Sequence, residues 1–215
     1  MLTIEQKKII DHKRGPAVVT AGPGTGKTHV LCHRVKHLTN RGVPKQKIVL
    51  LTFSKAAANN MAGRLEEKFG IDNVVCSTTH AFGLRILMDH WPELGFSAKP
   101  KVKTKLLNKR LAFIVKKVAA QNKIPYKKLQ NAVYRAIKEG KGSSSIKLDL
   151  SLSESVDEVL KRYKNGKLAR NWVDFANMLN LPTQLLKDNP DIMKKIGANI
   201  SHLLVDEMQD FSEKE

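Results

Sequence analysis

A glycine-rich run near the N-terminus contains residue types that bind phosphate. The run AGPGTGKT is glycine-rich and has the Gly-Lys-Thr ending of the G-x-x-x-x-G-K-[ST] pattern. Glycines allow backbone N–H groups to turn toward phosphate oxygens, and a helix that starts behind the run adds its positive end. Lys27 is placed to reach β- and γ-phosphates, and Thr28 offers a hydroxyl to Mg²⁺. The pattern predicts a P-loop for a nucleoside triphosphate with Mg²⁺. Its residues are Gly22, Pro23, Gly24, Thr25, Gly26, Lys27 and Thr28.

Two adjacent acids follow an apolar run near the other end of the sequence. In HLLVDE, Asp206 can hold Mg²⁺ through water, and Glu207 can orient and deprotonate an attacking water. Neighbouring side chains on a regular strand point to opposite faces, so the pair requires a turn. The plain alternative is an acidic loop after a strand. The P-loop favours the catalytic interpretation.

Strands and helices alternate around these two segments. Apolar runs predict strands at residues 17–20, 48–53, 74–77 and 199–206. Helical periodicity predicts helices at residues 28–42, 55–69 and 80–91. Ser54 and Gly70 have the types expected at the start and end of the second helix. The alternation predicts an α/β fold with a parallel sheet.

The positive charge is concentrated in one segment. The chain of 215 residues has a net charge of +18. Residues 97–170 hold 20 basic and 5 acidic residues, a net +15. The remainder of the chain holds 18 basic and 15 acidic residues, a net +3. This segment has a helical pattern, interrupted by GKGSSS at 140–145, with a further helix predicted at 153–164. Such segregation predicts a polyanionic partner, nucleic acid above all; a generally lysine-rich protein is the alternative.

Other features favour an intracellular protein without a metal centre of its own. Cys32 and Cys76 lie in apolar contexts, as buried free thiols do, and no apolar run predicts a signal or a membrane span. We expect a cytoplasmic, DNA-associated location and no membrane partner. His29, His33 and His37 recur every four residues but lie opposite the apolar helix face, so solvated side chains are favoured over metal ligands.

Together these motifs resemble the UvrD/Rep/PcrA family of superfamily 1 DNA helicases. LTIEQ at 2–6 is similar to the family's glutamine motif, and the P-loop with Arg34 to its Walker A segment. TFSKAAA at 52–58, with Met61 and Arg64, and TTHAF at 78–82 are similar to motifs near single-stranded DNA. Further matches are the Asp174-Phe175 pair and VDEMQD at 205–210, which is similar to Walker B.

The resemblance implies roles for individual residues. Catalysis is implied for Lys27, Asp206 and Glu207, with Thr28 and Asp206 as Mg²⁺ ligands. ATP contacts are implied for the P-loop, for Gln6 at the adenine edge, for Arg34 and for Gln209, which would couple the γ-phosphate to DNA. The implied DNA contacts are Thr52, Phe53, Ser54, Lys55, Thr79, His80 and Phe82.

Several residues depart from the family pattern. Lys55-Ala56-Ala57-Ala58 stands where the family often has Asn-Lys-Ala-Ala, Asn60 where it often has Glu, and Met208 where an aromatic is commoner. These changes concern the fine DNA contacts. Without the resemblance, His80 and Phe82 would be interpreted as core residues.

The resemblance implies a RecA-like P-loop fold with an inserted all-helical subdomain. We expect the ATP-binding subdomain at residues 1–96 and 183–215, and the basic DNA-binding insertion at 97–182. The implied activity is ATP-dependent 3′-to-5′ strand movement on DNA with single-stranded and duplex parts, in repair or replication. A second RecA-like half, in cis or in trans, would supply arginine fingers, so we expect this chain alone to hydrolyse ATP poorly.

Two other functions compete with the helicase hypothesis. The chain could be a DNA-binding or regulatory protein with a vestigial P-loop, which the basic segment motivates. A small P-loop kinase is a weaker third hypothesis, since neither an arginine-bearing lid nor an acceptor pocket is visible in the sequence. The oligomeric state is not predicted.

Overall fold

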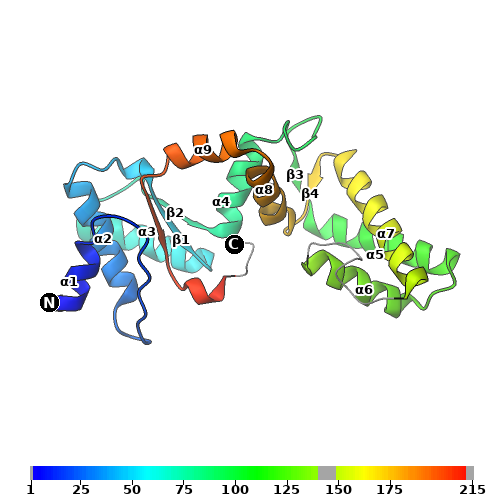
Figure 1. Ribbon diagram of the computed structural model, residues 1–215, viewed down its shortest axis with the longest axis horizontal. Coiled ribbons are helices and arrows are strands. Elements are labelled where there is room, and N and C mark those ends of the chain that lie inside the picture. The colour runs from blue at the N-terminus through cyan, green and yellow to red at the C-terminus, as the bar shows by residue number, and fades with distance from the viewer. Residues whose placement is uncertain (1, 140–148, 212–215) are drawn as a thin grey trace. The chain divides into compact units, whose positions relative to one another are not determined.

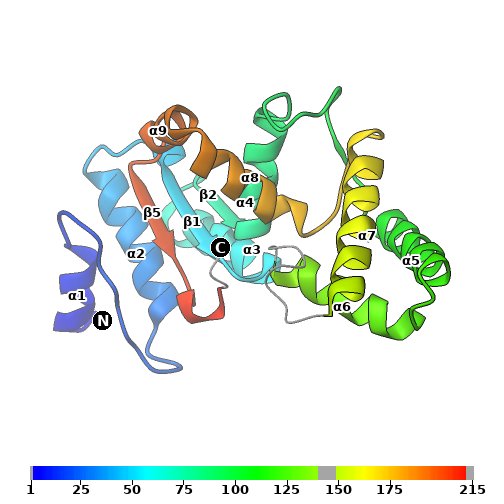
Figure 2. The same ribbon diagram turned by 45° about the vertical axis from the view of Figure 1, so that its right-hand side comes forward.

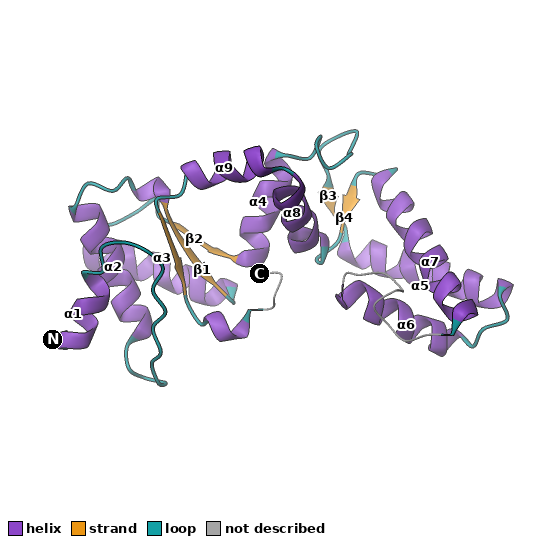
Figure 3. Cartoon of the chain, viewed as in Figure 1, coloured by secondary structure: helices purple, strands orange, loops and turns teal. Residues whose placement is uncertain are grey.

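The computed structural model describes residues 2–139 and 149–211, which belong to two compact units (Figures 1 and 3). The first unit comprises residues 1–82 and 189–215, and the second residues 83–188. The sequence instead placed the boundaries after 96 and 182, and that division into subdomains remains a prediction. The predicted break at 140–145 lies outside the described residues. No helix in the described ranges is long and apolar enough to cross a bilayer.

A three-stranded parallel sheet forms the centre of the first unit (Figure 2). The strand order is β2 (Val75–Thr78), β1 (Ile48–Thr52) and β5 (His202–Val205). In the register of the sheet, Leu50 lies opposite Cys76 on one side and Leu204 on the other. Every residue of β1 is buried, as expected for a central parallel strand. The predicted α/β class with a parallel sheet is confirmed.

Helices bury the sheet. The helices of the first unit are α1 (Ile4–Ile10), α2 (Lys27–Asn40), α3 (Lys55–Phe69) and α9 (Pro190–Ala198), with the beginning of α4 (Thr79–Asp89) and two short 3₁₀ turns, Lys45–Lys47 and Met208–Asp210. Val35 of α2 and Met61 of α3 are fully buried in one core with Leu50. Burial of such side chains contributes about 1.5–3 kcal/mol each. This core fixes the starts of α2 and α3 relative to the ends of the strands.

The ends of α3 follow local sequence signals, as predicted. The Ser54 side chain accepts a hydrogen bond from Ala57 N at 3.1 Å, which satisfies one free donor at the start of the helix. Gly70 ends the helix with φ of 62°, a left-handed conformation that glycine adopts without steric cost.

The strand predicted at residues 17–20 is absent. Residues 12–26 contain no helix or strand, and Val18 and Val19 are 87% and 47% exposed. A strand beside β5 would gain hydrogen bonds on one side only. With its valines uncovered, it would bury too little apolar surface to offset the entropy lost on ordering. The prediction that the P-loop directly follows a buried strand is therefore wrong.

The second unit is built on a three-helix core. Its helices are the remainder of α4, α5 (Thr104–Gln121), α6 (Tyr126–Glu139), α7 (Leu150–Leu168) and α8 (Asn177–Asp188). One apolar cluster unites α5, α6 and α7 through side chains such as Leu107, Leu129 and Val156. The helix predicted at 153–164 is longer at both ends. It starts earlier because the Asp149 side chain caps it by accepting from Leu152 N at 2.9 Å.

A short sheet corrects the expectation that this segment is entirely helical. β3 (Lys101–Val102) pairs in parallel with β4 (Trp172–Val173). The Asn171 side-chain oxygen accepts hydrogen bonds from Ser97 N at 3.0 Å and Ala98 N at 3.1 Å. The pairing therefore ties together the two places where the chain enters and leaves the helical core. Two-residue strands carry too little periodicity to be predicted from sequence.

Candidate phosphate-binding site

The P-loop ends in a backbone conformation that only glycine adopts readily. Gly24 and Gly26 have φ values of 73° and 86°, in the left-handed region. Helix α2 starts directly afterwards at Lys27, and no side chain caps its first N–H groups. Thr25 Oγ1 donates to Gly22 O at 2.8 Å, which closes the loop on itself. The free N–H groups and the helix dipole make this end of α2 attractive to a phosphate.

Lys27 and Glu207 form an ion pair. The Lys27 ammonium lies 3.3 Å from Glu207 Oε1 and 3.4 Å from the carbonyl oxygens of Ala21 and Gly22. The P-loop and the end of β5 are therefore adjacent, as a shared triphosphate site requires. Both side chains remain partly exposed, at 26% and 39%, so an incoming phosphate can compete with Glu207 for the ammonium.

The two acids after β5 are separated by a turn, as their proposed roles demand. Asp206 N donates to Leu51 O at 2.9 Å and continues the pairing with β1. Glu207 has φ of 51°, in the left-handed region, where a residue other than glycine costs of order 1–3 kcal/mol. The turn directs Glu207 to Lys27, while Asp206 is buried and lines a cavity together with Thr28.

The environments of the two acids shift their pKa values in opposite directions. Burial raises the pKa of Asp206, and the neighbouring charge of Glu207 adds to this; backbone hydrogen bonding, Lys27 and Thr28 oppose it. Hydrogen bonds from Gln209 and then Lys27 lower the pKa of Glu207. Of these two acids, Glu207 has a salt bridge to Lys27, whereas the buried Asp206 has no salt bridge to a cation among the described residues.

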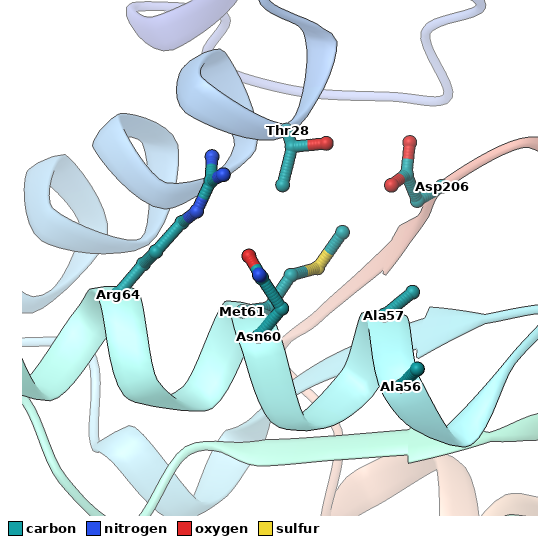
Figure 4. A pocket seen from close by; sticks show the side chains of 7 residues that line it. All are labelled: Thr28, Ala56, Ala57, Asn60, Met61, Arg64 and Asp206. Carbon is teal, nitrogen blue, oxygen red and sulfur yellow. The ribbon is translucent and has the colours of Figure 1, made fainter.

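A cavity of about 300 Å³ adjoins these residues (Figure 4). Thr28 and Asp206 line it from one side, and the α3 residues Ala57, Asn60 and Arg64 from another. The Arg64 side chain extends from α3 toward α2. The sequence placed Arg64 in a motif similar to one near single-stranded DNA and gave it no role at the nucleotide site. Its spacing of four and seven residues from Asn60 and Ala57, which puts all three on one helix face, is the signal that could have found it.

The residues at this cavity suit Mg²⁺. A hydroxyl from Thr28 and a carboxylate from Asp206 are hard oxygen donors, and the buried carboxylate needs a counter-charge. Mg²⁺ is commonly bound by one or two such groups, with waters and phosphate oxygens as the other ligands. Among the described residues, no group of three or more His, Cys, Asp or Glu side chains is placed so that it could hold a metal ion.

Gln6 lies against the P-loop, whereas Arg34 does not. The Gln6 side chain completes a capping box with Thr3, and its Nε2 donates to Thr25 O at 3.1 Å. Arg34 lies seven residues beyond Lys27, is buried, and donates to Ile10 O. The structure therefore places Gln6 at the loop, but Arg34 lines a different cavity. Gln209, which contacts Glu207 through its side-chain amide, is also at the site.

The predicted DNA residues of the first unit follow strands that end at the same edge of the sheet. Thr52 and Thr78 are partners at the ends of β1 and β2, and Leu51 pairs with Val205 immediately before Asp206. The segments at 52–55 and 79–82 thus begin at the edge where the phosphate site lies.

These residues differ in their exposure. Phe53 is 59% exposed, with its ring centroid 6.5 Å from that of Phe211, and Ser54 and Lys55 are also exposed. Thr52 and Thr79 are buried, and His80 and Phe82 are half-buried. Thr52 Oγ1 donates to Ser54 O at 2.9 Å, so Thr52 shapes the turn before α3. Of the predicted DNA residues, Phe53, Ser54 and Lys55 are the exposed ones.

These features define a class: an α/β protein whose P-loop and strand-end acids form one phosphate site. The family model described as UvrD/REP helicase N-terminal domain matches residues 2–214. The chain therefore belongs to the UvrD/REP helicase family, as the sequence motifs predicted.

Curated relatives agree with this assignment. A Rickettsia felis protein named probable DNA helicase II homolog is 27% identical over 97% of this chain. The ATP-dependent DNA helicases Rep of Buchnera aphidicola (subsp. Schizaphis graminum) and Escherichia coli are 29% and 28% identical over 97% and 95% of it. The matches cover 33%, 33% and 32% of these relatives, so the chain spans about a third of their length.

Proposed function

We propose that this chain is the N-terminal part of an ATP-dependent DNA helicase that couples ATP hydrolysis to 3′-to-5′ movement along DNA. The observation that carries the proposal is the convergence of Lys27 with Glu207 and of Thr28 with Asp206. Lys27 and Glu207 join the start of α2 to the turn after β5. Thr28 and Asp206 line the cavity of about 300 Å³. The relatives named ATP-dependent DNA helicase Rep support DNA as the substrate.

Each residue has a distinct proposed task. The N–H groups of the P-loop and the Lys27 ammonium bind the β- and γ-phosphates, and Gln6 contacts the adenine edge. Thr28 and Asp206 hold Mg²⁺, which neutralises phosphate charge. Glu207, whose lowered pKa keeps it ionised at neutral pH as an ordinary glutamate is, orients the attacking water and accepts its proton.

Phosphate binding and the Lys27–Glu207 ion pair exclude each other in this mechanism. When the γ-phosphate takes the Lys27 ammonium, Glu207 loses its cation and becomes available as the base. Gln209, hydrogen-bonded to Glu207, would transmit that change toward the DNA segments. Arg64 at the cavity wall would add positive charge near the phosphates.

DNA would lie at the edge of the sheet formed by the strand ends. Phe53 offers an exposed ring for stacking a base, and Lys55 a cation for a phosphate. The net charge of +15 over residues 97–170 supports an additional contact with single-stranded or duplex backbone through the helical insertion.

We further propose that a second RecA-like half, in cis or in trans, completes the catalytic site. Arginine fingers of such a half typically contribute about 10³–10⁵ in rate. In the part of this chain that the structure describes, Arg64 is the one cation that lines the cavity, and Lys27, next to Thr28, pairs with Glu207. The chain alone is therefore expected to bind nucleotide and hydrolyse it slowly.

Replacing Lys27 tests the proposal. Lys27→Ala should abolish binding of a fluorescent ATP analogue while leaving DNA affinity unchanged, because the phosphate site and the DNA edge use different side chains. Lys47→Ala, an exposed lysine of the first unit, is the matched control. Equal nucleotide affinity in the Lys27 variant and the parent chain would refute the P-loop assignment.

The alternative is a DNA-binding or regulatory protein with a vestigial P-loop, which the basic segment supports. ATP turnover stimulated by single-stranded DNA, measured on a protein that contains both halves, separates the two functions. Turnover that disappears with Glu207→Gln favours the helicase. DNA binding that is insensitive to ATP, without any turnover, favours the regulatory protein.

A further inference from the structure

A second cavity in the first unit has an almost entirely basic polar lining. Its volume is about 320 Å³. The polar side chains that line it are His12, Lys13, Arg14, Arg34, Arg41 and His202. None of the described residues lining it carries a carboxylate. A concave surface with several cations and no acid attracts anions.

This cavity is distinct from the proposed nucleotide site. Thr28 lines the first cavity and Arg41 the second, at opposite ends of α2. They are 13 residues apart, which corresponds to roughly 20 Å at about 1.5 Å per helical residue. Similarly, His202 begins β5 whereas Asp206 follows its end. The two cavities also share none of the described lining residues.

Arg34 is a buried cation without an ionic partner in the described part of the chain. It is only 7% exposed, and it donates to the carbonyl oxygen of Ile10. Burial and then Arg41 lower its pKa, while Asp11 raises it. Asp11 does not line the cavity and instead lies 3.4 Å from His37 Nδ1. A guanidinium has five N–H donors, and a buried cation without a counter-ion is costly. An anion in the cavity would offset that cost.

His202 provides a second, independent indication of a ligand. Its Nδ1 is buried and has no hydrogen-bond partner among the described residues. Burial and then Arg34 lower the pKa of His202, so the imidazole stays neutral at pH 7. A neutral imidazole still has one N–H to donate, and unsatisfied buried polar atoms are uncommon.

We propose that this cavity is a second anion site that binds a phosphate group, with Arg34 as the buried anchor and Arg14 and Arg41 at its mouth. Both mouth arginines are exposed, so their guanidinium groups can close on a phosphate in the bidentate geometry that arginine favours. The volume suits a small ligand, such as inorganic pyrophosphate or one phosphate of a strand. The site does not depend on the proposed helicase activity.

Pyrophosphate titration calorimetry of the Lys27→Ala chain tests this proposal with the P-loop disabled. Binding should persist in Lys27→Ala. It should weaken about tenfold or more when Arg14→Ala and Arg41→Ala are added, equivalent to about 1.4 kcal/mol. The control adds Lys7→Ala and Lys47→Ala instead, which removes the same charge at exposed positions outside the cavity. Circular dichroism verifies that every variant is folded.

Loss of all pyrophosphate binding in Lys27→Ala would overturn the proposal, as would equal affinities in the arginine variant and its control. Competition arms identify the source of the phosphate. A short 5′-phosphorylated oligonucleotide that displaces pyrophosphate from the Lys27→Ala chain, where its 5′-hydroxyl counterpart does not, assigns the site to a nucleic-acid end. Displacement by inorganic phosphate alone assigns it to a free anion. Failure of ATP binding in the parent chain would disprove the proposed function and leave this result standing.

Discussion

The two compact units each bury one aspartate to the same extent but provide for it differently. Asp206 in the first unit and Asp174 in the second are both 7% exposed. Asp174 accepts from the Tyr163 hydroxyl and the Lys167 ammonium, both at 2.9 Å, and from Asn177 N at 2.9 Å.

Asp206 lines a cavity together with Thr28, and the nearby Lys27 pairs with Glu207 instead. A buried charge with every oxygen satisfied stabilises the fold around it, whereas one without a cation is available to bind one. The difference teaches that burial alone does not identify a functional carboxylate; the identity of its partners does.

The largest expected effect is the loss of stability when Asp174, the buried aspartate of the second unit, is replaced. Asp174→Ala leaves the Lys167 ammonium, with a 13% exposed side chain, without its carboxylate, and should destabilise the second unit by about 3 kcal/mol. Trp91 and Trp172, the only two tryptophans of the chain, both belong to this unit. Urea unfolding followed by tryptophan fluorescence therefore measures it specifically. Glu154→Ala, at an exposed position of α7, should change the transition little. An unchanged midpoint of the urea transition in Asp174→Ala would mean that the hydrogen bonds and the salt bridge of Asp174 do not stabilise the second unit.

Replacing Asp206, the buried aspartate of the first unit, should change stability little but weaken ligand binding. Asp206→Asn should leave the fluorescence transition of the second unit unchanged and alter the stability of the first by less than about 1 kcal/mol. It should nevertheless remove the Mg²⁺-dependent part of the affinity for a fluorescent ATP analogue, because the Mg²⁺ ligand is lost. Hydrogen exchange of a peptide that contains β1 reports the first unit. If Mg²⁺ strengthens nucleotide binding equally in the parent and the variant, Asp206 is not its ligand.

The smallest expected effect is a change with pH in the stability difference between Asp206→Asn and the parent. Since the pKa of Asp206 is raised in the folded chain, the folded state holds this proton more tightly than the unfolded state. Ionised Asp206 therefore costs stability, and the cost develops as the pH rises above the unfolded value of about 3.9. Relative to the parent, Asp206→Asn should gain stability between about pH 4 and neutrality, measured by urea unfolding with circular dichroism. If the difference in stability between Asp206→Asn and the parent is constant with pH, burial does not shift the pKa of Asp206.

Local sequence signals determined much of the fold. The three strands of the sheet, the helix between Ser54 and Gly70 and the turn after Asp206 all agree with the predicted positions within a few residues. Each depends on features that residues near one another in the chain decide: apolar runs, a capping hydroxyl, and a glycine that tolerates positive φ. The P-loop was recognisable for the same reason, since its chemistry lies in consecutive residues.

The tertiary structure decided which side chains meet. Arg34 and Arg64 were both near recognised motifs, yet Arg64 lines the cavity with Thr28 and Asp206, while Arg34 is buried against α1. Residues 17–20 have a strand's composition but no strand, because a strand also needs hydrogen-bonding neighbours and cover for its apolar side chains. The sequence by itself determined the local elements and their chemistry. Helix packing and strand register determined which of those residues came together, because both depend on contacts between residues far apart in the chain.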